Sequence, residues 1–180
     1  YGHAGHGVSG SSSLVTYGTG IDFTAAQKRT YILFADTVPA TVNSCYTTTI
    51  SGSTAAPQNS PAQKTGDCIY TSSGTLSDAS LRTFTINNEM YISNLCATYT
   101  PSGSSAVTKC SSPSNAFKQL DITSARADVS THIYISGGTL PSPQSADSAC
   151  IEISSPDGKA HERITVSKVG TIFVERKKCL

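Results

Sequence analysis

Residues 149–180 read ACIEISSPDGKAHERITVSKVGTIFVERKKCL and carry the strongest strand signals in the chain. Apolar and polar residues alternate in three short runs, around Ile151, Ile164 and Ile172. The tetrapeptide SPDG separates the first two runs, and Val169-Gly170 separates the last two; Pro, Asp and Gly each favour a tight turn. The pattern predicts an antiparallel three-stranded meander with one apolar and one polar face. The apolar face must be buried against something else.

Composition favours a β-rich, secreted or surface protein. The chain has 180 residues, which fits one domain, and only 14% are charged, well below the usual quarter. No stretch is convincing as an amphipathic helix, so we expect a mainly β fold of antiparallel sheets. The net charge of +1 gives no general attraction to nucleic acid or to a membrane.

The cysteines predict a disulfide-stabilised fold made in an oxidising compartment. None forms a CxxC pair and no histidine lies at zinc-ligand spacing; buried free thiols are the alternative. Cys96–Cys110 would close a Gly/Ser-rich loop, and Cys45–Cys68 is plausible for the same reason. Cys150–Cys179 is the remaining pair. It needs a bend or different partners, because a simple meander puts the two at opposite ends.

The domain limits follow from changes in composition. Residues 1–16 are Gly/Ser-rich and predict a flexible segment, and residues 17–180 form one β-rich domain with a Thr/Pro-rich insertion at about 38–76. Residues 43–52 and 67–74 of that insertion predict a hairpin. Residues 30–36, TYILFAD, are nearly all apolar, so we expect a central strand.

Further strands are predicted at 117–123 and 132–138, where apolar and polar residues alternate. Residues 81–96 predict two strands joined by a left-handed turn at Asn87-Asn88.

The sequence shows no constellation of catalytic residues, so we expect no enzyme activity. There is no GxSxG motif, and His161 falls at a hairpin tip with nothing to activate. His3 and His6 have metal-ligand spacing but lie in the Gly-rich N-terminus, where a solvated role is expected. Asp36 either caps a turn or binds Ca²⁺ with loop oxygens, so no cofactor is expected apart from that alternative.

One cluster of basic residues stands out near the C-terminus: Arg163, Lys168, Arg176, Lys177 and Lys178. One interpretation is a solvated edge that discourages pairing between sheets. The other is a small phosphate-binding patch that gives weak, salt-sensitive binding to DNA.

Several stretches together resemble the globular domain of type IV pilin-like proteins, and most closely the GspH/FimT group of minor pilins and H-type pseudopilins. They are YGTGIDF (17–23), TYILFAD (30–36), LRTFTINNEMYISNLC (81–96), LDIT (120–123) and the closing ACIEISSPDGK with RITVSKVGTIFV. Such domains are built on an N-terminal helix that anchors in the membrane and packs the filament core. This chain does not contain that helix, and the apolar face of the closing strands would be part of its seat.

The resemblance implies a non-enzymatic filament subunit of a type IV pilus or a type II secretion-like system. Such a subunit acts in adhesion, motility, secretion or DNA uptake, at the cell surface, outside the cell or in the periplasm. Its partners are other pilin subunits and, through basic C-terminal residues, DNA; it meets the membrane only through the helix that this chain lacks. The alternatives are a DNA-binding module and a secreted β-sandwich adhesin.

Overall fold

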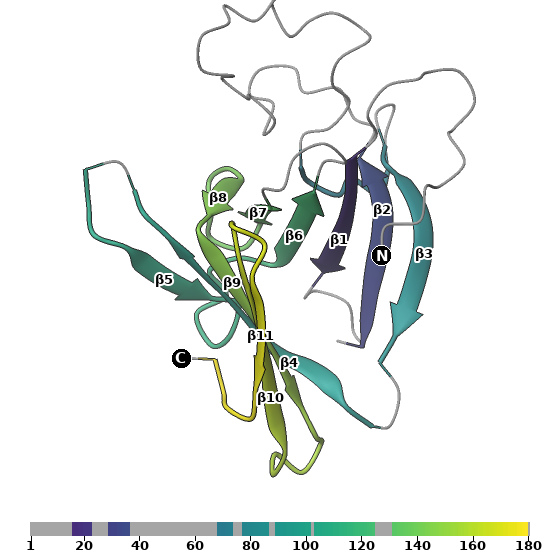
Figure 1. Ribbon diagram of the computed structural model, residues 1–180, viewed down its shortest axis with the longest axis vertical. Coiled ribbons are helices and arrows are strands. Elements are labelled where there is room, and N and C mark those ends of the chain that lie inside the picture. The colour runs from purple at the N-terminus through teal and green to yellow at the C-terminus, as the bar shows by residue number, and fades with distance from the viewer. Residues whose placement is uncertain are drawn as a thin grey trace, which may run out of the picture.

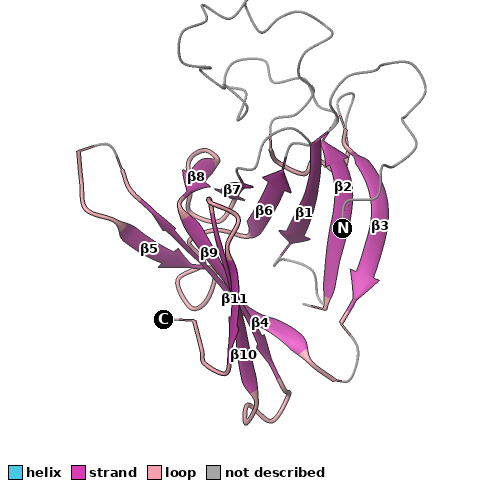
Figure 2. Ribbon diagram, viewed as in Figure 1, coloured by secondary structure: helices cyan, strands magenta, loops and turns pink. Residues whose placement is uncertain are grey.

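The computed structural model describes residues 16–22 (backbone only), 29–36, 68–73, 77–86, 89–101, 103–124 and 131–179. These residues form eleven strands and no helix, as Figure 2 shows. None of them therefore belongs to a helix long and apolar enough to cross a membrane. All strand pairs are antiparallel, which confirms the prediction of a mainly β, antiparallel fold.

The strands build two sheets (Figure 1). Sheet A has the order β3-β2-β1-β6-β7-β8. Its strands are β1 (Thr16–Asp22), β2 (Thr30–Asp36), β3 (Ala79–Thr85), β6 (Gln119–Ser124), β7 (Thr131–Ser136) and β8 (Gln144–Ala146). Sheet B has the order β11-β10-β9-β4-β5. Its strands are β4 (Tyr91–Tyr99), β5 (Val107–Cys110), β9 (Ser148–Ser154), β10 (His161–Ser167) and β11 (Ile172–Glu175).

The main core lies between the two sheets, because both contribute the apolar side of their alternation. Leu120, Ile133 and Ile135 from sheet A and Leu95 from sheet B are fully buried in it. Burial of a side chain of this size contributes roughly 1.5–3 kcal/mol before the entropy of ordering is subtracted.

The strand predicted as central is β2, and its position between β1 and β3 confirms the prediction. Its C-terminal half is buried, and Phe34 is fully enclosed beside Tyr70, with ring centroids 5.1 Å apart. The near-continuous apolar run reflects this burial on an interior strand.

The closing meander predicted at the C-terminus is β9, β10 and β11. Gly158 and Gly170 have φ of 67° and 79°, and each amide donates to the carbonyl three residues earlier, Ser155 and Ser167. A left-handed residue closing a short hairpin loop is a role that Gly fills without steric cost.

Sheet A covers most of the meander's apolar face. Ile151 and Val166 are buried in the core, and Ile153 and Ile164 pack against it. The last strand extends beyond this cover, since Ile172 and Val174 are 63% and 64% exposed.

Residues 81–96 contribute two strands, as predicted. β3 pairs with β2 in sheet A and β4 pairs with β9 in sheet B, so the two strands lie in different sheets. The hairpin predicted from residues 43–52 and 67–74 is not confirmed. Residues 68–73 form no strand, and the other half of that predicted hairpin, 43–52, lies outside the described residues, as do residues 1–15.

The chain crosses from sheet A to sheet B at Asp147, between β8 and β9. Its amide donates to the carbonyl of Thr98 (2.8 Å), and its carbonyl accepts from the amide of Lys168 (2.9 Å). The carbonyl of Lys168 in turn accepts from the amide of Thr131, the first residue of β7 (2.9 Å). At this corner, backbone hydrogen bonds therefore link β4 and the end of β10 in sheet B to the start of β7 in sheet A.

Candidate functional site

The polar face of β9 and β10 gathers most of the titratable side chains of sheet B. Register pairs Ser154 with His161 and Glu152 with Arg163 on this face. The bond from the Ser155 amide to the Ala160 carbonyl (3.0 Å) makes these two pairs non-hydrogen-bonded ones. Side chains approach most closely in such pairs, which explains the contacts that follow.

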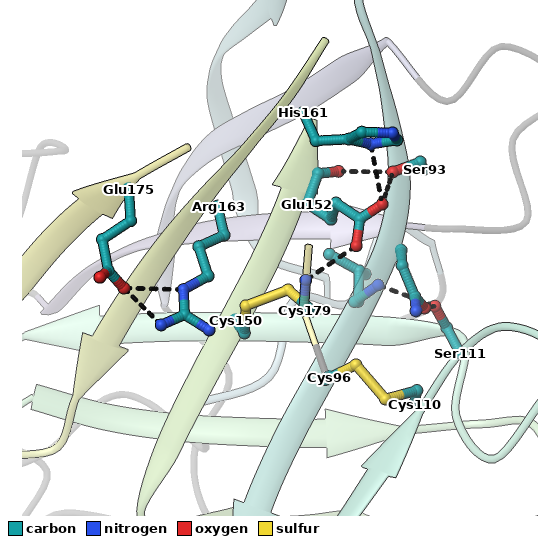
Figure 3. Close-up of a disulfide and its surroundings, with 12 residues drawn as sticks. Ser93, Cys96, Cys110, Ser111, Cys150, Glu152, His161, Arg163, Glu175 and Cys179 are labelled. Carbon is teal, nitrogen blue, oxygen red and sulfur yellow. Dashed lines mark hydrogen bonds and ion pairs between the residues drawn. A yellow bond between two sulfur atoms is a disulfide. The ribbon is translucent and has the colours of Figure 1, made fainter. Parts of the chain in front are cut away.

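Glu152 lies at the centre of a hydrogen-bonded cluster, shown in Figure 3, and is 7% exposed. Its Oε1 accepts a bond from the hydroxyl of Ser93 (2.8 Å), which itself accepts from the hydroxyl of Ser154 (2.7 Å). Nδ1 of His161 lies 2.8 Å from the Ser154 hydroxyl and 3.5 Å from Glu152 Oε1. The second ring nitrogen donates to the carbonyl of Gly158 (2.7 Å), so both sides of the imidazole are engaged.

The second oxygen of Glu152 holds the C-terminal tail, residues 176–179. Glu152 Oε2 accepts a hydrogen bond from the amide of Cys179 (2.8 Å). Cys179 is also disulfide-bonded to Cys150, which lies two residues before Glu152 on the same face of β9. The tail thus leaves the end of β11 and returns across β10 to β9. It supplies the bend that the Cys150–Cys179 pair requires, with Cα atoms 6.1 Å apart.

Serine, histidine and glutamate are the residue types of a hydrolytic triad, but their burial assigns them a structural role here. Ser154 is 1% exposed and its hydroxyl already contacts Ser93 and His161. A nucleophile must reach its substrate, and this hydroxyl does not face solvent. The cluster instead satisfies a buried carboxylate and fixes the end of the chain to the sheet.

Three of the five basic residues predicted to bind DNA have acidic partners. Arg163 forms a charge-assisted hydrogen bond from Nε to Glu175 (2.8 Å) and a second contact through its terminal nitrogen. Lys168 pairs with Asp147, and Lys177 lies 3.5 Å from Glu175.

The other two, Arg176 and Lys178, are exposed on the tail. No carboxylate of the described residues lies within ion-pair distance of either one. The structure places all five basic residues on or beside the β10–β11 hairpin, where Arg163 and Lys177 share the single carboxylate of Glu175.

These ion pairs change the acidity of their carboxylates. The hydrogen bonds from Lys168 and then from the Thr100 hydroxyl lower the pKa of Asp147. The hydrogen bond from Arg163 lowers the pKa of Glu175. Both side chains remain more than a third exposed, so water screens the pairs and each stabilises the fold only modestly.

Asp36, the residue with a Ca²⁺ alternative, is fully buried at the end of β2. Its Oδ2 accepts a bond from the amide of Cys68 (2.7 Å), which ties the end of the strand to a loop residue 32 positions away. Within the described part of the chain no group of three His, Cys, Asp or Glu residues could hold a metal ion. His3 and His6 lie outside that part.

The disulfide framework agrees with the predicted pairing wherever it can be seen. Cys96 and Cys110 are directly opposed on β4 and β5, with Cα atoms 4.0 Å apart, and they are disulfide-bonded. Cys68 is also disulfide-bonded, whereas Cys45, its predicted partner, lies outside the described residues. The disulfides indicate an oxidising compartment outside the cytosol.

The cluster around Glu152 is the feature that sequence reasoning missed. His161 is predicted at a hairpin tip with nothing to activate, yet hairpin register alone places it opposite Ser154, and alternation places Ser154 on the face of Glu152. Counting outward from the SPDG turn would have found this contact. Ser93 gives no comparable signal, because a register irregularity between Ile92 and Asn94 sets its position.

No protein-family model matches the chain, and no curated protein or solved structure is significantly similar to it.

Proposed function

We propose that this chain is the globular domain of a type IV pilin-like filament subunit. It would be a minor pilin or pseudopilin that works outside the cytosol by packing and display and not by catalysis. The observation that carries the proposal is the placement of the stretches that resemble this group. They occupy β1, β2, β3 with β4, β6, and the closing β9–β10–β11 meander, and so they account for most strands of both sheets.

The disulfides and the anchored tail also support this function. A subunit displayed on a filament outside the cell has no chaperones or reducing pool to repair it, so covalent closure is useful there. Cys150–Cys179 closes the last part of the chain back onto the sheet, and the Glu152 cluster fixes the same end by hydrogen bonds. These contacts make the polar face of sheet B a rigid surface.

The test begins with the reading frame ahead of Tyr1. The proposal predicts a prepilin cleavage motif followed by an apolar helix of about 20 residues, the length that spans a bilayer. A cleavable secretory signal peptide directly ahead of the domain would contradict it. Immunogold electron microscopy of producing cells provides the second part, with antibodies raised against residues 68–180. Label on surface or periplasmic filaments is expected, and label confined to the soluble secreted fraction would reject the proposal.

A further inference from the structure

The last strand of sheet B, β11, exposes an unusual amount of apolar surface. Ile172, Phe173 and Val174 are 63%, 58% and 64% exposed, and Val169 in the preceding turn is 73% exposed. Single exposed apolar residues are common on soluble proteins, but here three consecutive ones are exposed: Ile172 and Val174 on the apolar face of the meander and Phe173 on the other face. No described strand pairs with the outer side of β11.

The three other edge strands each carry a protective feature that β11 lacks. In sheet A, β8 has only three residues, and the pairing of β3 with β2 contains a register shift. In sheet B, β5 and β11 have four residues each, but β5 carries a cation, Lys109, within the strand, whereas β11 has none. Short strands, bulges and charges are the usual ways to prevent edge pairing.

The hydrogen-bond pattern of the β10–β11 hairpin shows which backbone groups are open. The Ser167 amide donates to the Thr171 carbonyl (3.0 Å), so this pair is a hydrogen-bonded one. Alternation then makes Thr165 with Phe173 the next hydrogen-bonded pair and Arg163 with Glu175 the one after it. The amides and carbonyls of Ile172 and Val174 therefore point away from β10, ready to accept another strand.

Charge around this edge favours an acidic occupant. Arg163, Lys177 and the tail residues Arg176 and Lys178 give four cations at the C-terminal end of β11 against the single carboxylate of Glu175. The tail returns across β10 to Cys179 beside β9, so Arg176, which directly follows the end of β11, is the tail cation nearest this edge.

We propose that β11 is a docking edge that binds an extended segment of a partner protein as a sixth strand of sheet B. The backbone of that segment bonds to Ile172 and Val174, its apolar side chains pack beside the exposed side chains of β11, and a flanking acidic residue faces Arg176. Strand addition of this kind draws affinity from backbone hydrogen bonds and specificity from alternate side chains. The inference does not depend on membership of a filament.

The test is amide hydrogen exchange, read by NMR on the whole chain with its disulfides intact. The probe is a synthetic peptide with a Val-Thr-Val-Thr-Val centre and two aspartates at each end. We expect it to slow exchange at Ile172 and Val174 by about tenfold or more, while the amide of Phe173, which already faces β10, changes little. The same peptide with lysines in place of the aspartates should bind at least about tenfold more weakly.

A pair of variants distinguishes binding through the backbone of β11 from non-specific hydrophobic binding. Val174→Pro removes the outward amide without disturbing the bonds to β10, and it should lose the protection at Ile172. Val174→Thr keeps that amide and the branched side chain, and it should bind as the native chain does. Equal binding by both variants would overturn the proposal.

Other occupants give different results, each of which also overturns it. Protection at Ile172 and Val174 that rises with protein concentration alone would assign the edge to a second copy. A 20-base-pair DNA duplex that shifts the resonances of Arg176 and Lys178, with no effect of the acidic peptide at Ile172 or Val174, would assign the tail to nucleic acid. No protection by the acidic peptide at millimolar concentration would reject strand addition outright.

Discussion

The edge strands β3 and β11 end their sheets in opposite ways. β3 mixes Arg82, Thr83 and Thr85 with its apolar residues, and the register shift in its pairing with β2 interrupts the ladder. Its one large aromatic residue, Phe84, is half-buried, stacked on Tyr31 (4.9 Å between ring centroids) and covered by the guanidinium of Arg82. By contrast, β11 places three consecutive apolar residues in water.

The difference lies in where the charges sit. On β3 a cation within the strand covers the aromatic side chain, so the edge protects itself. β11 itself carries no cation; Arg176 follows its end, and a disulfide and the Glu152 cluster hold the end of the tail at β9. The β11 edge thus exposes apolar side chains along the strand and carries positive charge near its C-terminal end. This combination is expected of a docking strand.

The largest effect should come from freeing the tail. Cys150→Ala with Cys179→Ala opens a bridge between residues 29 positions apart, and loop-closure entropy predicts a loss of about 3–4 kcal/mol in the free energy of unfolding. Denaturant titration measures the loss, and hydrogen exchange should speed up in β11 but not in β3.

The matched control opens the other described bridge. Cys96→Ala with Cys110→Ala removes a closure over 14 positions, for about 3 kcal/mol, and should leave exchange in β11 unchanged after correction for global stability. If both double variants loosen β11 equally, the tail does not hold that edge.

The next effect concerns the carboxylate beneath the tail. Glu152→Ala leaves the buried Cys179 amide without its acceptor and removes the carboxylate to which the Ser93 hydroxyl donates, and an unsatisfied buried group costs roughly 1–3 kcal/mol. We expect a loss in that range by thermal or denaturant unfolding. Glu162→Ala removes a carboxylate of β10 that is exposed to solvent, and it should change stability by less than about 0.5 kcal/mol. Equal losses in the two variants would show that the cluster contributes nothing specific.

Much of this site could be predicted from sequence where the signal is local. The closing meander followed from two-residue alternation around Ile151, Ile164 and Ile172 and from two turn motifs, all within one stretch. The Cys96–Cys110 bridge followed from loop length in the same way.

The missed features depend on contacts between distant parts of the chain. Which sheet receives β3 and which receives β4 is decided by pairing with β2 and β9, to which residues 81–96 give no clue. The neutralisation of Lys168 needs Asp147 at the crossing between sheets, 21 positions earlier. Alternation predicts that Ile172 and Val174 lie on a buried face. They are exposed because sheet A does not extend far enough to cover β11, which the local sequence does not show.

A third prediction compares the two edge aromatics directly. Phe84→Ala removes a stacked, half-buried ring from β3 and should lower stability by about 1–2 kcal/mol. Phe173→Ala on β11 removes a ring that is 58% exposed, and the change should be within about 0.5 kcal/mol. Denaturant unfolding of the two variants decides the matter, and a larger loss for Phe173 would mean that β11 is already packed against something in solution.

The smallest effect is the response of the β11 edge to acid. The lowered pKa values of Glu175 and Asp147 mean that their ion pairs contribute stability that is complete above the ordinary carboxyl values, 4.5 and 3.8, and is lost as pH falls through the lowered folded values. Glu175→Gln and Asp147→Asn remove these two groups, so the variants should lose less stability than the native chain between about pH 5 and pH 3. Because β3 carries no carboxylate, its packing should not contribute to this difference. If the free energy of unfolding, measured with denaturant, depends on pH in the same way in the native and variant chains, the ion pairs with Arg163 and Lys168 do not stabilise the hairpin.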